Sequence, residues 1–546
     1  MILVWLILIL LAAGLISFPA GKGNKNLPRW ISLIALLADL VLVLVLWMNN
    51  SGQTSAPEQD DWMVQFLVQW IPQLGIGFHL AIDGLSLLMV VMTLFLGLLA
   101  VIVSWKHEVN RPGFYYFNIL WIIAGITGVF LAVDLFLFYF FWEVMLVPMY
   151  FLISNFGHEK RIAASYKFFI FTQGSGLLML ISFLGIYFIH GHNTGTYTFD
   201  YMQLLGTVIH RPAAAWLMLS LFVAFIVKLP MVPFHTWLPE ATTEAPATGS
   251  VILAGLLWNT GAYGIIRMVL PFFPDISQEF APAAMLLGVA GILYGAKLAF
   301  AQPDLKRLIT YTSISHMGFL MLGVYAFNEL AMQGVVLQLI THSISTSALL
   351  IMAGVLHERL QTRDIGKMGG LWADAPRMGG IGLVFVMATL GLPGMGNFLA
   401  EFLVLLGSYQ SSVLYTVLGS LGLVAAVIYG LRIMQKVFYG ERNHTGKTVD
   451  FNVRERLVMG LLIISIFWLG LFPQPVINTA RPALMKILQK EMNIDIKPFD
   501  NNDNNKKMIL IDDITTMLSS GTDNRNLSYM PVPENSIYKK KTYVEP

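Results

Sequence analysis

The chain has 546 residues, of which 56% are hydrophobic and only 12% are charged. Soluble globular proteins carry about a quarter charged residues, so this composition excludes a soluble enzyme and a disordered chain. The 34 Lys and Arg against 32 Asp and Glu leave a net charge of +2, which excludes a nucleic-acid binder. The lack of cysteine excludes disulfides, thiolate-bound zinc and Cys-ligated iron–sulfur clusters. The sequence therefore predicts a polytopic membrane protein.

Long apolar segments follow one another along the chain, each near the roughly 20 residues that a transmembrane helix needs. They number fourteen and lie near 2–18, 28–48, 85–105, 114–132, 135–154, 163–189, 214–238, 246–270, 281–301, 308–326, 330–356, 378–407, 412–435 and 456–473. The first has no charged start and no small-residue cleavage site, so we expect a retained helix rather than a signal peptide. The expected fold is an all-α membrane protein with about 14 transmembrane helices.

The charges of the connecting loops predict the orientation, because basic loops stay on the inner side. Basic residues follow six of the seven odd-numbered segments: Lys22, Lys25, Arg29, Lys106, Arg111, Lys160, Arg161, Lys306, Arg307, Arg359, Arg363, Lys367, Lys436, Arg442 and Lys447. The intervening loops are acidic or neutral, with Glu58, Asp60, Asp61, Asp134, Asp200, Asp275, Glu279 and Glu329. This alternation predicts that both termini lie on the outer side.

Proline and glycine interrupt two of the hydrophobic segments. The seventh contains VKLPMVPFHTWLPE, and the twelfth contains LGLPGMGNFLAEF. Proline removes a backbone donor and clashes with the preceding turn, so both helices should break. Paired broken helices are typical of inverted-repeat transporters, although ordinary proline kinks are the alternative. We therefore expect N-terminal helices in 1–112, two inverted five-helix repeats in 113–271 and 280–440, and a last helix in 455–475.

The end of the chain, 476–546, has a different composition. Its last part, 496–546, is rich in Asn, Asp, Lys and Ser, as in NNDNNKK and YKKKTY, with one short apolar run, MILIDDI. Such a polar composition cannot bury enough apolar surface to fold by itself. We expect a disordered or peripheral extension here.

Several ionisable side chains fall inside the predicted helices, where charges are costly and usually functional. Glu143, Lys228 and His342 lie about 12, 21 and 18 Å along their helices, too deep to reach the membrane surface easily. A deep Glu and Lys on neighbouring helices can act as a switch, because a lysine separated from its carboxylate partner releases its proton more readily.

Shallower charges and the histidines have competing explanations. Lys167, Arg267 and Lys297 lie within one or two turns of a helix end, which favours side chains that reach for the membrane surface. His316 and His342 suit a proton relay, since histidine titrates near neutral pH. Structural hydrogen bonds are an equally strong explanation for these two histidines.

The sequence contains no motif for nucleotide binding or for metal binding. There is no GxGxxG after a strand, no Walker loop, and no HExxH or other metal-ligand spacing. We therefore expect no metal, no cofactor-binding residue and no redox centre in this chain.

The longest motifs match a known family. HLAIDGLSLLMVV, FYFFWEVMLVPMYFLI, YKFFIFTQ, VKLPMVPFHTWLPEA, AFAQPDLKRLITYTSISHMGF, RDIGKMGGLW and ATLGLPGMGNFLAEF closely resemble the antiporter-like subunit M family (chain 4 in mitochondria) of bacterial proton-translocating NADH:quinone oxidoreductase, respiratory complex I. The resemblance covers residues 1 to about 485. It implies fourteen helices and proton pumping in the membrane arm of that complex.

The resemblance also implies roles for six side chains: Glu143, Lys228, Lys167, His316, His342 and Glu401. By the matching motifs, Glu143 would be the coupling glutamate, Lys228 the pumping lysine, and Lys167 a lysine that competes for the glutamate. The two histidines would connect Lys228 to Glu401, which would lie at the outer half-channel. The family often has lysine at that last position, so Glu401 favours subunit M over its sister subunits and over Mrp-type antiporters.

The sequence departs from the family pattern at three positions near this route. Asn259 stands where a stretch like LLKTAAYG normally has lysine, and Thr242 stands where a PDAHSQAP-like loop has histidine. Lys297 stands where an apolar residue is usual. We expect Asn259 to hold a water chain between Lys228 and His316; the alternative is that this subunit has lost pumping.

The function that the resemblance implies is outward proton translocation driven by electron transfer in other subunits. Those partners would carry NADH, FMN, iron–sulfur clusters and quinone, and sister antiporter-like subunits would flank this one on both sides. The implied location is the lipid bilayer of the bacterial inner membrane, with no nucleic acid involved. An Mrp-type cation/proton antiporter subunit is the alternative.

Overall fold

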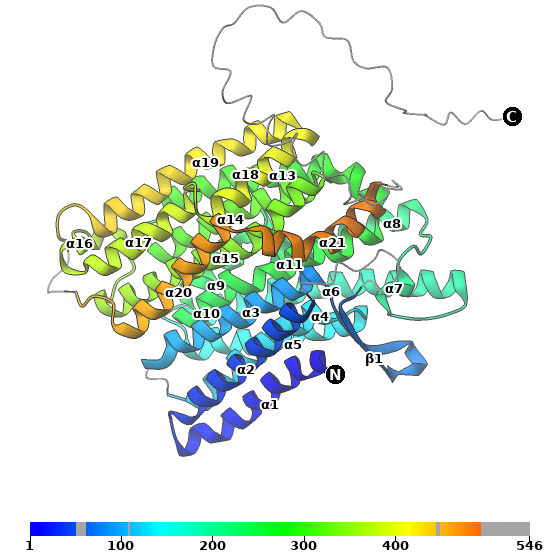
Figure 1. Cartoon of the computed structure of the whole chain (residues 1–546), viewed down its shortest axis with the longest axis horizontal. Helices are drawn as coiled ribbons and strands as arrows, with labels where there is room; N and C mark the ends of the chain where they lie inside the picture. Colours follow the sequence, from blue (N-terminus) through cyan, green and yellow to red (C-terminus); the bar gives the residue numbers. More distant parts are fainter. Residues whose placement is uncertain (51–61, 107–109, 444–447, 493–546) are drawn as a thin grey trace, which may run out of the picture. The chain divides into compact units, whose positions relative to one another are not determined.

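The computed structural model describes residues 1–50, 62–106, 110–443 and 448–492, and nearly all of this part is helical (Figure 1). The long helices, in chain order, are α1 (Ile2–Gly23), α2 (Leu27–Asn50), α3 (Gly84–Val103), α4 (Pro112–Leu131), α5 (Leu135–Phe156), α6 (Arg161–Thr194), α8 (Arg211–Lys228), α13 (Pro274–Ala301), α14 (Leu305–Val324), α15 (Glu329–Leu360), α17 (Pro376–Thr389), α18 (Gly396–Ser411), α19 (Val413–Ile433), α20 (Val453–Leu471) and α21 (Gln474–Met492).

Shorter helical segments connect them. These are η1 (Pro72–Leu74), η2 (Ser104–Lys106), α7 (Tyr201–Leu204), η3 (Phe234–Thr236), α9 (Trp237–Glu244), α10 (Ala247–Ile252), η4 (Leu253–Leu257), α11 (Trp258–Gly264), η5 (Ile265–Val269), α12 (Leu270–Phe272), η6 (Ile365–Lys367), α16 (Leu371–Asp374) and η7 (Met434–Phe438). The segments η4, η5 and η7 are π-helical. Together α10 to α12 form one continuous span, Ala247–Phe272.

The all-α membrane fold predicted from the sequence is confirmed. Eleven helices in the described ranges are long and apolar enough to cross a membrane, and the bent pair α20–α21 would make twelve. Helix α14 and the α17–α18 pair occupy the tenth and twelfth predicted segments but are not among the eleven. The count of fourteen spans, the inverted repeats and the orientation stay predictions.

Both predicted helix breaks are present. Helix α8 ends at Lys228, and regular helix resumes only at η3 and α9. Helix α17 ends at Thr389, and α18 begins at Gly396. In this second break Gly391 and Gly394 have φ values of +74° and +93°, which glycine adopts without steric cost.

The apolar middle parts of two central spans are fully enclosed by the other helices. In Ala247–Phe272 and in α15, all residues of the 18-residue apolar stretch are buried. In α1, α2 and the α19–η7 span, no more than 39% of that stretch is buried. A helix that is buried on all sides can keep polar side chains away from lipid. These two central helices carry Asn259 and His342.

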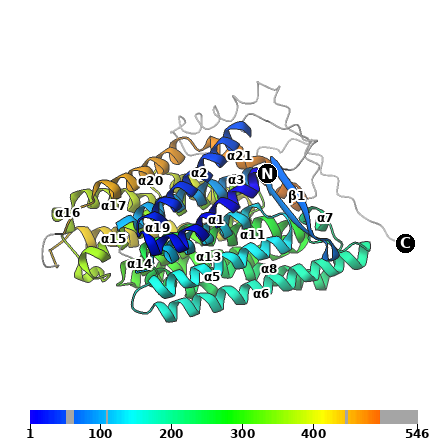
Figure 2. The ribbon, with the colours of Figure 1, turned by 90° about the horizontal axis from the view of Figure 1, so that it is seen from below.

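A β-hairpin between α2 and α3 was not predicted from the sequence. Strands β1 (Val64–Ile71) and β2 (Ile76–Ile82) pair antiparallel, with Phe66 opposite Leu80 (Figure 2). The two strands have only eight and seven residues, too short to show the length of a transmembrane helix. Asp134 anchors the hairpin by accepting hydrogen bonds from the backbone N–H groups of Gly77 and Leu137. Burial raises the pKa of Asp134 to about 6 despite these donors.

The predicted extension 476–546 is ordered in its first part. Helix α21 turns by 67° from α20, and its residues Val476, Ala480 and Leu484 are buried. Apolar side chains at four-residue spacing give this helix a face that packs on the bundle, which the overall polar composition of the segment concealed. Residues 493–546 lie outside the described part of the chain, as do Glu58, Asp60, Asp61 and Lys447.

Candidate functional site

The carboxylate of Glu143 sits in the middle of α5 beside a glycine of α6. A Cβ atom at Gly176 would lie 2.6 Å from Oε1 of Glu143. The missing side chain of Gly176 therefore makes the space that the carboxylate occupies. Glu143 is half-buried, and Trp142, its neighbour in sequence, is fully buried.

Lys228, the last residue of α8, points into this region. Its side chain is 0% exposed, and its Nζ lies 4.9 Å from the centre of the Trp142 ring and 5.9 Å from that of Phe168. Within the described residues Nζ has no hydrogen-bond partner and no carboxylate within 4.0 Å. The expected pair Glu143–Lys228 is therefore separated in this structure, and the aromatic faces stabilise the cation instead.

Lys167 has a different partner from the one the resemblance implied. Its Nζ donates a hydrogen bond of 2.7 Å to Glu240 of α9, just beyond the break after α8. The side chain thus forms an ion pair with Glu240 rather than with Glu143. Both members are partly exposed, at 29% and 39%.

Asn259 links the two central helices. Its Nδ2 donates to Oγ of Ser343 at 3.0 Å and to the carbonyl of Gly255 at 3.3 Å. Its Oδ1 is buried and accepts no hydrogen bond from the described residues. The ring of the preceding residue, Trp258, lies 5.7 Å from that of His342. Asn259 therefore carries an unused buried acceptor and bonds Ser343, the residue that follows His342.

His342, His316 and Glu401 form one buried cluster. The rings of the histidines are 5.0 Å apart, and Nδ1 of His316 lies 2.6 Å from Oε1 of Glu401. None of the three side chains is more than 2% exposed. The structure thus brings together three residues that the sequence placed on separate helices, α15, α14 and α18.

Two further side chains of this cluster were not predicted from the sequence. The hydroxyl of Tyr429 lies 3.1 Å from Nε2 of His316, and Nε2 of Gln338 donates to Glu401 at 3.4 Å. Neither carries a charge at neutral pH, so a search for ionisable groups could not find them. The only feature of the sequence that could have indicated them is that both are polar residues within mostly apolar helices.

Arg267 does not reach for the membrane surface, contrary to expectation. It is 7% exposed and forms an ion pair with Asp83, the residue that caps α3. The rings of Trp62 and Tyr263 lie 5.1 and 5.5 Å from its guanidinium carbon. A buried carboxylate partner explains why the charge stays inside. By contrast Lys297 is exposed on α13.

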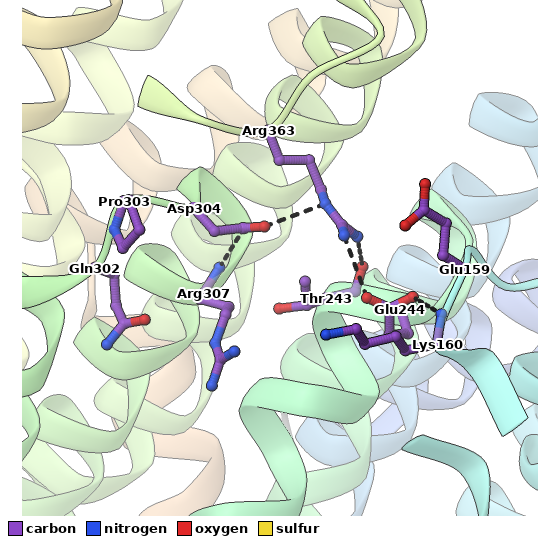
Figure 3. Close-up of a pocket in the computed structure, with 9 residues that line it drawn as sticks. All are labelled: Glu159, Lys160, Thr243, Glu244, Gln302, Pro303, Asp304, Arg307 and Arg363. Atoms are coloured by element: carbon purple, nitrogen blue, oxygen red, sulfur yellow. Dashed lines mark hydrogen bonds and ion pairs between the residues drawn. The ribbon is translucent and has the colours of Figure 1, made fainter. Parts of the chain in front are cut away.

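Opposite charges line a pocket of about 370 Å³ at the end of the bundle where α6 and α14 begin (Figure 3). We call it the charged pocket; its lining residues are Glu159, Lys160, Thr243, Glu244, Gln302, Pro303, Asp304, Arg307 and Arg363. Arg363 lies between two carboxylates, 3.2 Å from Glu244 and 3.1 Å from Asp304. Three of the loops that line it carry the basic residues that predict an inner location. Across the described ranges, no group of three or more His, Asp or Glu is arranged to hold a metal ion.

Comparison with known proteins gives the family. Residues 132–428 match the transmembrane family described as NADH:quinone oxidoreductase/Mrp antiporter. The chain is 49% identical to NADH-quinone oxidoreductase subunit M of Pseudomonas aeruginosa and 47% identical to that of Escherichia coli, each over 90% of this chain and 98% of the relative.

Solved structures agree. The fold matches a chain of respiratory complex I from Thermus thermophilus with a TM-score of 0.79 and 28% identity, covering 89% of this chain and all of that one. It also matches the Mrp complex from Dietzia sp. with a TM-score of 0.79 over 89% of this chain and 97% of that one, but at 20% identity this likeness concerns the fold alone. The chain therefore belongs to the NADH:quinone oxidoreductase/Mrp antiporter transmembrane family, and within it to the NADH-quinone oxidoreductase subunit M relatives.

Proposed function

We propose that this chain is an antiporter-like subunit of NADH:quinone oxidoreductase that translocates protons outward across the bacterial inner membrane. The observation that carries the proposal is the buried contact between His316 and Glu401, with His342 beside it. Burying a carboxylate and two imidazoles costs free energy that apolar residues of similar size would not. A proton-transfer role gives a reason for keeping them.

The proposed route runs along the middle of the membrane. It begins at Glu143 and Lys228, with Lys167 as the competing lysine, and continues past Asn259 to His342, His316 and Glu401. The separation of Lys228 from Glu143, and the pairing of Lys167 with Glu240, support a switch with at least two arrangements. In the present one, Nζ of Lys228 lies beside the rings of Trp142 and Phe168 and forms no ion pair with Glu143.

The energy for pumping comes from other subunits. Moving one charge against 100 mV costs about 2.3 kcal/mol, and this sequence contains no motif for NADH or for a redox centre. We propose that partner subunits of the membrane arm, including sister antiporter-like subunits on both sides, transmit the free energy. NADH, FMN, iron–sulfur clusters and quinone would be bound by other subunits of the complex.

An Mrp-type antiporter subunit is the second candidate, because an Mrp complex shares the fold. The much higher identity to subunit M relatives favours the first candidate. Purification of the intact assembly separates the two. NADH-oxidising peripheral subunits should co-purify with this chain, and an intact complex without them would support the antiporter instead.

The decisive test of the role is Glu143→Gln. It removes the charge but keeps the size of the side chain, so the complex should assemble and oxidise NADH with an artificial acceptor while proton pumping falls sharply. Lys228→Ala should do the same, and Glu143→Asp should be milder because it keeps the charge. Glu279→Gln, which changes an exposed carboxylate paired with Arg211, is the matched control. Full pumping by the assembled Glu143→Gln complex would disprove the proposal.

A further inference from the structure

We propose that protons reach His342 from the charged pocket through a ladder of polar side chains formed by Lys306, Thr310, Ser313 and Thr346. This inference rests on the proposed function and adds to it an entrance and its residues. None of these four was assigned a role by sequence: Lys306 counted only as a basic loop residue. The geometry of α14 and α15 carries the argument.

Lys306 forms the foot of the ladder. It lies in the first turn of α14 between Asp304 and Arg307, which both line the charged pocket. Its own side chain is 0% exposed and turns inward, where Nζ donates to the carbonyl of Ala245 at 3.0 Å and to Oγ of Ser250 at 3.2 Å.

This inward turn of Lys306 is unusual for its position. No carboxylate lies within ion-pair distance of Nζ in the described ranges. A lysine at a helix end normally extends its amine toward water, and a buried ammonium without a carboxylate is costly. A role in proton exchange would explain why the ammonium group of Lys306 is buried.

Hydroxyl groups continue inward along one face of α14. Thr310 lies one turn above Lys306 and donates to its carbonyl at 2.8 Å. Ser313 lies in the following turn, where its Oγ is 3.4 Å from Oγ1 of Thr346 on α15. Positions 306, 310 and 313 are about 6 and 4.5 Å apart along the helix axis, distances that one water molecule can bridge.

The ladder ends at Nε2 of His342. Oγ1 of Thr346 lies 3.1 Å from Nε2 of His342. The other ring nitrogen, Nδ1, has no hydrogen-bond partner within the described chain, and this ring stands 5.0 Å from that of His316. His342 can therefore receive a proton on Nε2 and release one from Nδ1 toward the cluster.

Each transfer leaves every ladder group with its original number of hydrogens, and the hydroxyl groups rotate back before the next proton. A hydroxyl accepts a proton on an oxygen lone pair and passes its own hydrogen to the next group, which is why Ser and Thr can serve where apolar residues cannot. Lys306 gives up one proton and regains one from water in the charged pocket. The ladder thus leads from the side of the membrane that the basic loops assign as inner to the buried histidines.

The test replaces Thr346, the only ladder group in the described structure that contacts both Ser313 and His342. Thr346→Val keeps the shape and removes the hydroxyl, so NADH-driven proton pumping in inside-out membrane vesicles should fall by about tenfold, as expected for losing one buried hydrogen-bonding partner. Thr346→Ser should restore it. Thr93→Val is the matched control, because Thr93 is an equally buried helical threonine whose hydroxyl, among the residues described, bonds only the carbonyl of Met89.

The outcomes separate the ladder from the proposed function. Normal pumping by Thr346→Val together with loss in Glu143→Gln would overturn the ladder alone, whereas normal pumping by both would overturn the function as well. Equal losses in Thr346→Val and Thr346→Ser would also overturn the ladder, since they point to packing. Should Thr346→Val fail to assemble, Ser313→Ala removes the adjacent hydroxyl with a smaller change, and normal pumping by that variant would overturn the ladder.

Discussion

The imidazole of His316 lies 2.6 Å from the carboxylate of Glu401, and neither side chain is more than 2% exposed. A contact this short requires a proton between the nitrogen and the oxygen, because two lone pairs facing each other at 2.6 Å would repel. The contact joins α14 to α18 next to the second helix break. A substitution of either residue therefore changes the number of protons that the pair can hold and also the packing of α18 against α14.

Tyr429→Phe should weaken pumping several-fold. The substitution removes the hydroxyl that lies 3.1 Å from Nε2 of His316, and a buried nitrogen left without its partner costs about 1–3 kcal/mol. Tyr415→Phe on the same helix serves as the control, because that ring is only partly buried and lies outside the cluster. Proton translocation per NADH oxidised is the measurement, and equal values for both variants would contradict the role of Tyr429.

Gly176→Ala should displace the carboxylate of Glu143. The added methyl group would stand 2.6 Å from Oε1, well inside van der Waals contact. Gly174→Ala is a matched control two residues away on α6, where a Cβ atom meets nothing within 4 Å. Alanine at 174 should slightly stabilise the helix and leave pumping unchanged, whereas alanine at 176 should reduce pumping several-fold. Proton pumping by both variants is measured in membrane vesicles. Equal pumping by Gly176→Ala and Gly174→Ala would contradict the prediction.

Asn259→Leu should impair pumping, because it removes both the hydrogen bond to Ser343 and the free acceptor Oδ1. A water molecule at this site would then have too few polar partners. Lys297→Met should have little effect, since Lys297 is exposed on the outer surface of α13. The reverse result, with Asn259→Leu normal and Lys297→Met impaired, would move the proton route to α13.

Arg267→Met should destabilise the subunit by about 3–5 kcal/mol, the usual cost of leaving one member of a buried ion pair alone. Its partner Asp83 is equally buried. The double variant Arg267→Met/Asp83→Asn should recover part of the loss, because no uncompensated charge remains. Thermal denaturation of the solubilised complex would measure this. A double variant no more stable than Arg267→Met alone would show that the ion pair is not the cause.

Single cysteines should report the orientation without interference, since the chain has none of its own. Cysteines at Lys160 and Lys367 should react with a membrane-impermeant reagent only from the inner side. Outer-side labelling is expected at Asp61 and in the tail, both outside the described residues. Labelling of position 160 from the outer side would reverse the predicted topology.

The sequence was informative wherever one residue type has a strong local effect. Proline and glycine predicted both helix breaks, and the cost of charge in lipid singled out Glu143, Lys228 and His342. Partners were not predictable, because they depend on how distant segments pack. Arg267 meets Asp83 from 184 positions away, and Lys167 meets Glu240 from 73 positions away. Periodicity within one segment contains no information about such pairs.

The three-residue bridge in the charged pocket limits how this sequence can change. Arg363 holds Glu244 and Asp304 together, and the pocket contains three acidic and three basic side chains in all. Loss of Arg363 alone would leave Glu244 and Asp304 without the cation that they share, so we expect a neutral residue at 363 only where one of the two carboxylates has also been replaced. Substitutions at these three positions should therefore arise in compensating sets, and a variant of this subunit that differs at one of them is expected to differ at a second.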